Sequence, residues 1–197
     1  GHGNLTLREA LAKSSNVYFS QLGTKLGKDL LLKYMRDYGF NRQIDWNCNT
    51  GAFKDEFRIK KSYFPSRNEL TYEEIAWASI GQGKVLSTPM QWGLITAAIA
   101  NEGMMMKPMI EMGRKSQRMN RVMKKSTANK IKEMMRSVVT NGTGFRVNIP
   151  GLDICGKTGT AEVRKGFSHS WFVAFAPYDK PVLASAVIIE NGGYGSV

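Results

Sequence analysis

Apolar residues recur at helical spacing over most of the first 140 residues. Thr6 and Glu9 have the pattern of a capping box, which predicts a short helix that runs to about Lys13. Further helices are predicted where apolar sets begin at a threonine cap or end at a glycine: Tyr18, Phe19, Leu22 and Leu26 before Gly27; Leu31, Tyr34, Met35 and Tyr38 before Gly39; the segment opened by Thr71; Met90, Leu94, Ala97 and Ala98 between Thr88 and Gly103; and Ile131, Met134, Met135 and Val138 within residues 126–139.

Two segments of this helical part lack a clear period. Residues 41–70 are rich in Asn, Lys and Phe, and we interpret them as an irregular surface segment. The cluster Met104–Met106 follows a predicted helix, and we interpret it as core filling, because methionine adapts to irregular gaps.

The period changes after the turn-rich sequence Asn141-Gly142-Thr143-Gly144. Residues 154–163, 171–176 and 182–189 are short apolar runs bounded by Gly, Pro and Asp, as expected of strands. Sequential strands with short turns favour an antiparallel sheet, with the helices on one side of it or in a lobe of their own. The predicted class is α+β, with a helical lobe followed by antiparallel strands.

Composition and charge narrow the class of protein. A chain of 197 residues with 42% hydrophobic and 22% charged residues is expected to fold as about one globular domain. The net charge of +12 suits a polyanionic neighbour, which leaves nucleic acid, an anionic membrane surface and an anionic cell-wall polymer open. The basic residues are not interleaved with stacking aromatics, so we expect no nucleic-acid partner and interpret the charge as a solvated basic face.

Neither a metal nor another cofactor is expected. Cys48 and Cys155 have no ligand spacing, so buried free thiols are the expected state. Only His2 and His169 supply imidazoles, too few for a multi-histidine metal site. The sequence contains neither a secretory signal nor an apolar run of about 18 residues, so any targeting element is expected outside these residues.

Two short polar segments, far apart in the chain, carry candidate chemistry. In Lys157-Thr158-Gly159-Thr160, on a predicted strand, the lysine can hold a carboxylate and the glycine leaves the strand open to a ligand. In Ser14-Ser15-Asn16, between two predicted helices, the serine hydroxyl can relay a proton and the asparagine can hold an amide. Alone, Ser14 is more simply a helix cap or a loop serine, and the lysine segment is structural. Together the two triplets resemble the second and third motifs of serine acyl-transfer enzymes that act on penicillin-like substrates, and this resemblance implies one cleft shared by Ser14 and Lys157.

In order and spacing, several stretches resemble the later part of the transpeptidase domain of class B (monofunctional) penicillin-binding proteins. The resemblance covers nearly the whole chain, and its motif combination matches that of serine enzymes acting on penicillin-like substrates. The supporting stretches are His2-Gly3, Leu11-Ala12-Lys13-Ser14-Ser15-Asn16, Ile80-Gly81-Gln82-Gly83 with Thr88-Pro89 and Gln91, Ala98-Ile99-Ala100-Asn101-Glu102-Gly103, Gly156-Lys157-Thr158-Gly159-Thr160-Ala161-Glu162, and Trp171-Phe172-Val173-Ala174-Phe175-Ala176-Pro177.

The resemblance implies a peptidoglycan D,D-transpeptidase. Members attack a D-alanyl-D-alanine stem peptide with a serine, pass the acyl group to an amine on a neighbouring strand, and are acylated by β-lactams. It implies catalytic roles for Ser14, Asn16 and Lys157 and substrate binding by Thr158, Gly159 and Thr160, with the Thr160 N–H in the oxyanion hole. It also implies a place on the extracytoplasmic face of the bacterial membrane, anchored by a segment outside this chain.

The family's Ser-x-x-Lys motif does not occur in these 197 residues. We therefore expect a partial transpeptidase domain, mainly helical over residues 1–140 and with antiparallel strands over residues 141–197. The nucleophile segment, two strands and a final helix are expected to be missing, and the upstream part of the same protein is the expected partner. Without the nucleophile the chain is expected to be inactive alone.

Other interpretations stay open. A serine β-lactamase or a penicillin-sensor domain of the same fold shares these triplets and differs in the fate of the acyl group. A catalytically inactive scaffold that binds cell-wall assembly partners is also compatible with the basic surface. Neither His169 nor the nucleophile-like spacing of Thr127-Ala128-Asn129-Lys130 is expected to take part in catalysis, since the latter lies in a helix and in the wrong order for the family.

Overall fold

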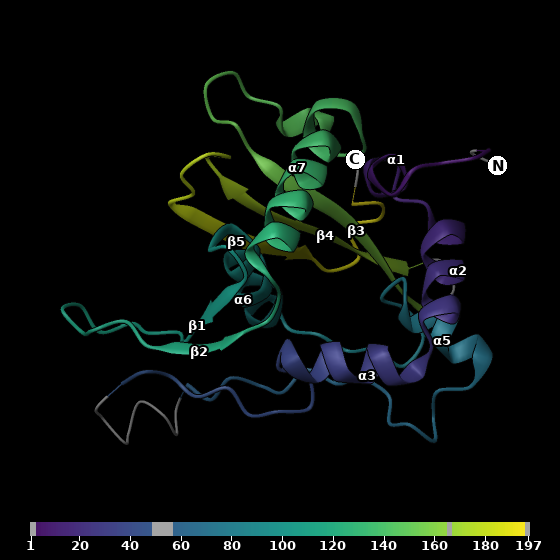
Figure 1. Ribbon diagram of the computed structural model, residues 1–197, viewed down its shortest axis with the longest axis horizontal. Helices are drawn as coiled ribbons and strands as arrows, with labels where there is room; N and C mark the ends of the chain where they lie inside the picture. The colour runs from purple at the N-terminus through teal and green to yellow at the C-terminus, as the bar shows by residue number, and fades with distance from the viewer. Residues whose placement is uncertain (1–2, 49–56, 165–166, 196–197) are drawn as a thin grey trace.

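A computed structural model describes residues 3–48, 57–164 and 167–195, which form a helical part on one side of a three-stranded sheet (Figure 1). His2 lies outside the described residues. The helices are α1 Leu7–Ala12, α2 Asn16–Leu26, α3 Lys28–Asp37, α5 Tyr72–Ala78, α6 Pro89–Ala100, α7 Lys125–Asn141 and the short 3-10 helix η1 Phe145–Val147; the strands are β1 Met104–Met106, β2 Arg118–Arg121, β3 Cys155–Arg164, β4 Phe167–Ala176 and β5 Leu183–Ile189.

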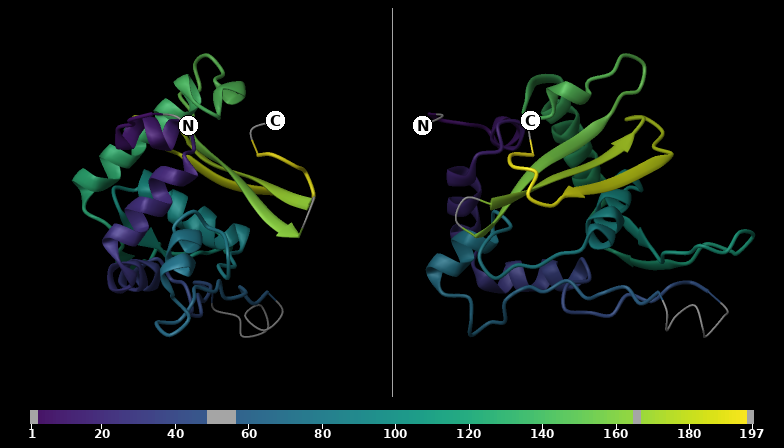
Figure 2. Two further views of the ribbon diagram at one scale, coloured as in Figure 1. Left: turned by 90° about the vertical axis from the view of Figure 1, so that its right-hand side faces the viewer. Right: turned by 180° about the vertical axis from the view of Figure 1, so that it is seen from behind.

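The three C-terminal strands form an antiparallel sheet in the order β3-β4-β5. Helices α6 and α7 lie against one face of this sheet, α6 mainly on β5 and α7 on β3 (Figures 1 and 2). Buried Met135 of α7 packs there with Cys155 and Phe175 in a small apolar cluster. The predicted α+β class and the antiparallel arrangement are confirmed.

Helices begin where the caps predict them. The Thr6 hydroxyl accepts the Glu9 N–H at 3.3 Å, and the Glu9 carboxylate accepts the Thr6 N–H at 2.8 Å, so the capping box is complete. Thr71 caps α5 and Thr88 caps α6 in the same way, each through the backbone N–H three residues on. Local side-chain chemistry therefore sets these starting points.

The structure adds a hairpin, β1 paired with β2, that the pattern did not predict. All four residues of β2 are exposed, so its sequence has no alternation of apolar and polar positions that would indicate a strand. Met105 of β1 is fully buried, which confirms core filling for the centre of the methionine cluster.

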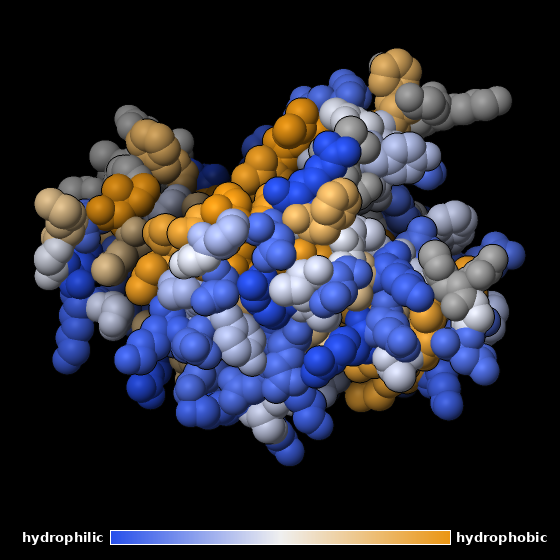
Figure 3. All heavy atoms as spheres, turned by 90° about the horizontal axis from the view of Figure 1, so that it is seen from above, coloured by the Kyte–Doolittle hydropathy of each residue, from blue (hydrophilic) through white to orange (hydrophobic). Residues whose placement is uncertain are grey.

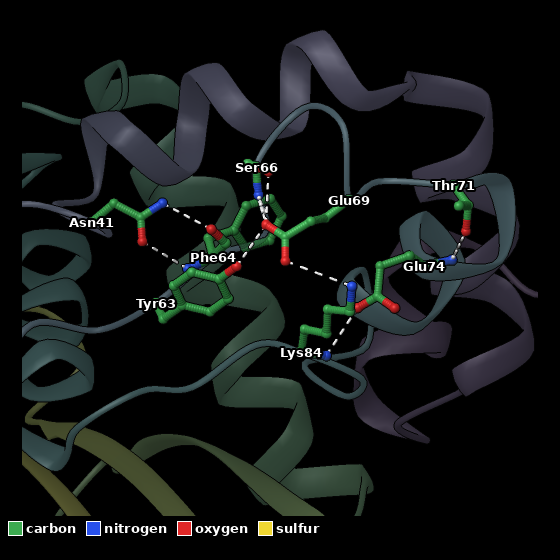
Figure 4. A network of polar contacts seen from close by, with 8 residues as sticks. All are labelled: Asn41, Tyr63, Phe64, Ser66, Glu69, Thr71, Glu74 and Lys84. Atoms are coloured by element: carbon green, nitrogen blue, oxygen red, sulfur yellow. Dashed lines mark hydrogen bonds and ion pairs between the residues drawn. The ribbon is translucent and has the colours of Figure 1, made fainter.

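The interpretation of residues 41–70 as a surface segment is wrong for much of the described part. Ile44, Ser62, Phe64 and Leu70 are all buried, although the backbone is irregular. Side chains supply the missing backbone partners: the Asn41 amide donates to the Phe64 carbonyl at 2.8 Å and accepts the Phe64 N–H at 3.0 Å (Figure 4). An irregular segment can be buried when its polar groups are satisfied in this way.

Glu69 ties the end of this segment together (Figure 4). Its carboxylate accepts the hydroxyl of Tyr63 at 2.7 Å and both the hydroxyl and the backbone N–H of Ser66, and Lys84 lies 3.6 Å away. Hydrogen bonds from Ser66, followed by those from Tyr63, lower the pKa of Glu69 to about 2. The segment therefore enters α5 in a fixed position.

The other face of the sheet exposes apolar side chains on β5. Ala186 meets Gly93 of α6, so the alternating side chains of Val187 and Ile189 point away from the helices. Leu183, Val187 and Ile189 are between half and three-quarters exposed. Figure 3 shows apolar side chains gathered in a stripe across the top of the molecule, bordered by polar ones.

Candidate active site

The junction between α1 and α2 presents Ser14 in an unusual backbone conformation. Ser14 has a φ of 52°, in the left-handed region that a non-glycine residue rarely adopts. The α2 cap is Ser15, whose hydroxyl accepts the Tyr18 N–H at 3.4 Å, so Ser14 is not the helix cap but lies in the turn between the two helices. Ser14 is half-buried, and its hydroxyl is available for a partner from another part of the chain.

That partner is Lys157 on β3. The Lys157 Nζ donates to Ser14 Oγ at 2.8 Å and to the Thr158 carbonyl at 2.7 Å. The two segments are separated by 143 positions in the sequence, and the structure brings them into direct contact. The predicted meeting of Ser14 and Lys157 is therefore confirmed.

Burial changes the acid–base chemistry of this amine. Desolvation lowers the pKa of Lys157 from 10.5 to about 8, because the charged form loses water that its neutral partners replace only in part. The amine is still mostly charged at neutral pH. Its partners here, a hydroxyl and a carbonyl oxygen, are uncharged, so the site holds a positive charge suited to an anion.

The outer edge of β3 is open to a further strand within the described sheet, where β3 pairs with β4 alone. At this edge the Gln82 amide donates to the Thr160 carbonyl at 2.9 Å. In an antiparallel strand the N–H and C=O of one residue point to the same side, so the Thr160 N–H also faces the open edge. Gly159 lies opposite Trp171, and a Cβ added there would lie 3.1 Å from Trp171 Cβ.

The remaining predicted residues take different positions. Asn16 is the first residue of α2 and is exposed, two positions after Ser14. Thr158 is buried, with its hydroxyl 2.6 Å from Thr143 Oγ1, and the Thr160 hydroxyl accepts the Gly195 N–H at 3.1 Å. Of the six predicted residues, Ser14, Lys157 and Thr158 form one set of contacts.

Sequence reasoning missed two residues that contact this segment. In the sequence, Gln82 lies within the family stretch Ile80-Gly81-Gln82-Gly83 and Thr143 within the turn-rich Asn141-Gly142-Thr143-Gly144, and neither carries a functional prediction. Their partners, Thr160 and Thr158, lie 78 and 15 positions away. A polar side chain between two glycines was the one available signal for Gln82.

The two rejected candidates occupy structural positions. His169 lies on β4 opposite Ala161, and its Nδ1 accepts the Asn191 N–H at 3.0 Å, which holds the turn after β5. Thr127 and Lys130 lie in the first turns of α7 and are exposed.

The whole chain matches one family. Residues 1–197 align with the family described as "Penicillin binding protein transpeptidase domain". The chain belongs to this family. The resemblance drawn from the motifs is thereby confirmed, and the open edge beside Lys157 lies in a transpeptidase fold.

Relatives and solved structures agree with this assignment. The chain is 29% identical over 227 residues to the peptidoglycan D,D-transpeptidase MrdA of Acinetobacter baumannii, covering 99% of this chain and 33% of that protein. It superimposes with a TM-score of 0.88, at 32% identity, on a D,D-transpeptidase domain from Eggerthella lenta, covering 100% of this chain and 51% of that one. The imipenem acyl-enzyme of penicillin-binding protein A from M. tuberculosis gives a TM-score of 0.84 at 30% identity, covering 98% of this chain and 44% of that one.

The chain thus spans about a third of the length of the curated relative it matches. Among the helices that the structure describes, none is both long and apolar enough to cross a membrane.

Proposed function

We propose that this chain forms part of a peptidoglycan D,D-transpeptidase that cross-links stem peptides by serine acyl transfer. The observation that carries the proposal is the 2.8 Å contact between the Lys157 amine and the Ser14 hydroxyl beside an open strand edge. The names of the relatives support the same activity, and one solved neighbour is an acyl-enzyme with imipenem.

In the proposed reaction a serine of the upstream sequence attacks the carbonyl of the penultimate D-alanine. The proton of that serine is relayed to the nitrogen of the terminal D-alanine, the C–N bond breaks, and D-alanine leaves as an amine. An amine of a neighbouring stem peptide then attacks the acyl-enzyme. The serine oxygen leaves and takes up the proton that this amine loses, which completes the cross-link. The serine of this mechanism lies outside the 197 residues.

The proposed roles follow from the positions of the side chains. Lys157 is charged, and its hydrogen-bond partners, the Ser14 hydroxyl and the Thr158 carbonyl, are neutral, so it holds the terminal carboxylate of the substrate. Ser14 accepts from Lys157, so its own hydrogen is available to protonate the leaving nitrogen. Asn16, exposed at the start of α2, binds a substrate amide.

The open edge of β3 supplies the other half of the site. A stem peptide or a β-lactam lies along it as an added strand, over Gly159. The Thr160 hydroxyl adds a contact, and Thr158, whose buried hydroxyl is bonded to Thr143, contributes through its main chain. The Thr160 N–H stabilises the oxyanion, a kind of interaction whose removal costs about 10²- to 10³-fold in rate when the donor is a side chain. The complete protein is proposed to act on the extracytoplasmic face of the membrane, anchored by its N-terminal sequence.

Labelling by a fluorescent penicillin tests this proposal. The complete protein is expected to form a covalent adduct that survives denaturation, and Ser14→Ala and Lys157→Met are expected to slow its formation. This chain alone is expected to stay unlabelled, because it lacks a Ser-x-x-Lys nucleophile. An intact protein that never labels would favour the scaffold interpretation, and rapid loss of the label would favour a β-lactamase.

A further inference from the structure

The turn after α7 packs directly on the end of α1. The Gly142 N–H closes the helix on the Val138 carbonyl at 3.1 Å, and a Cβ added to Gly142 would lie 2.3 Å from the Ala12 carbonyl oxygen. Such an approach is closer than any side chain allows, so glycine is needed at this position. The turn is therefore held against the segment that leads into Ser14.

The next residue, Thr143, contacts both motif-bearing segments at once. Its backbone N–H donates to the Ala12 carbonyl at 3.0 Å, two residues before Ser14. Its hydroxyl lies 2.6 Å from the Thr158 hydroxyl, one residue after Lys157. Thr143 therefore joins the α1–α2 junction, through its backbone N–H, to β3, through its hydroxyl.

The Thr158 hydroxyl lies between the Lys157 amine and the Thr143 hydroxyl. The Lys157 ammonium lies 3.5 Å from Thr158 Oγ1 and can only donate to it, whereas either hydroxyl of the Thr143–Thr158 pair can be the donor. Thr158 is 9% exposed, and a short hydrogen bond in such surroundings strongly favours one geometry. The Thr143 hydroxyl therefore fixes the orientation of Thr158 beside the amine.

We propose that Thr143 is a positioning residue that sets the separation of Ser14 and Lys157 in the proposed transpeptidase site, an inference that rests on the proposed function. Thr143 acts through Ala12 and Thr158 and does not itself touch the substrate. A shift of about 1 Å between groups that must act together can cost on the order of 10²-fold in rate. Loss of the Thr143 hydroxyl removes its bond to Thr158 on β3, while the main-chain bond to Ala12 is retained.

The experiment measures acylation of the complete protein by a fluorescent penicillin, separated into the initial affinity and the acylation rate constant. Thr143→Val keeps the shape and removes the hydroxyl, and it is expected to lower the rate constant by about 10- to 100-fold with little change in affinity. Thr143→Ser keeps the hydroxyl and is expected to restore the rate. Thr140→Val is the matched control, because Thr140 is exposed on α7 and bonds only within its own region.

Two outcomes would overturn the inference: wild-type kinetics in Thr143→Val, or a Thr143→Ser variant as slow as Thr143→Val. Thermal unfolding of each variant shows whether it is folded. If the valine variant does not fold, Thr143→Ala and Thr143→Ser, which differ only by the hydroxyl oxygen, are compared instead, and equal rates refute the role. A wild-type protein that fails to label refutes the proposed function and is thus distinguished from failure of this inference.

Discussion

The charge on Lys157 should make acylation depend on pH in a range where an ordinary lysine does not titrate. Burial lowers the pKa of this amine from 10.5 to about 8. From that value, about nine-tenths of the free protein carries the charge at pH 7 and only about one-tenth at pH 9. If the charge holds the carboxylate of a penicillin, the second-order rate constant of acylation falls about tenfold for each pH unit above 8.

The assay follows labelling of the complete protein by a fluorescent penicillin between pH 6 and pH 10. The second-order rate constant reports the free protein, so binding of the carboxylate, which raises the pKa of Lys157, does not move the measured limb. Lys157→Arg retains its charge over the whole range and is expected to lose the limb near pH 8, even if its overall rate is lower. Lys157→Met is expected to react slowly at every pH.

This comparison also separates Lys157 from other titrating groups. A limb near pH 8 that persists unchanged in Lys157→Arg belongs to another residue. A wild-type rate that stays level up to pH 10 would contradict both the lowered pKa and the carboxylate role.

Further predictions concern the stability of this chain and the reactivity of its buried thiol. The pKa of Lys157 is lower in the folded state than in the unfolded state, so the charged amine destabilises the folded protein. The free energy of unfolding of the wild type, measured by urea titration and compared with Lys157→Met, should rise by up to about 3 kcal/mol between pH 8 and pH 10.5. Below pH 8 the wild type should be destabilised by that whole amount. Thr6→Ala removes the α1 cap and should cost about 1 kcal/mol in the same titration at pH 7, whereas an unchanged midpoint would refute a stabilising capping box. Gly23→Ala should cost about 1–3 kcal/mol, because the added Cβ would lie 1.7 Å from Ser79 Oγ. Gly93→Ala is the control within a helix, since its added Cβ would lie at an ordinary contact distance of 4.0 Å from Ala186 Cβ, and equal stability of the two variants would refute the clash. Burial raises the pKa of the Cys155 thiol to about 11, so a thiol reagent should modify Cys155 at pH 8 only after denaturation. Rapid modification of Cys155 itself in the native chain, distinguished from Cys48 by peptide mapping, would contradict that burial.

The parts of the fold that sequence reasoning predicted are those with local causes. Thr6 and Glu9 bond to each other three positions apart, so the start of α1 can be predicted from four residues. The hairpin strand β2 was missed because all of its side chains are exposed and carry no period. The Asn41 side chain bonds to the backbone N–H and carbonyl of Phe64, which lies 23 positions away. No local sequence pattern indicates such a contact.

In the candidate site, too, some contacts could be predicted from the sequence and others could not. Ser14 and Lys157 were predicted to meet because each belongs to a recognisable triplet, and the 2.8 Å contact confirms it. Thr143 and Gln82 belong to no such chemical pattern, and their importance follows only from contacts made after folding. Sequence alone could predict which two segments meet but not the residues that hold them together.

The 143-residue separation between the two halves of the site also has a kinetic consequence. Closing so long a loop costs chain entropy that only late, long-range contacts repay, and structures dominated by such contacts fold slowly. The Lys157 amine can reach Ser14 only once the C-terminal strands have docked on the helices. Antibiotic capture by the newly made protein would therefore report completion of its tertiary structure, later than any signal from helix formation.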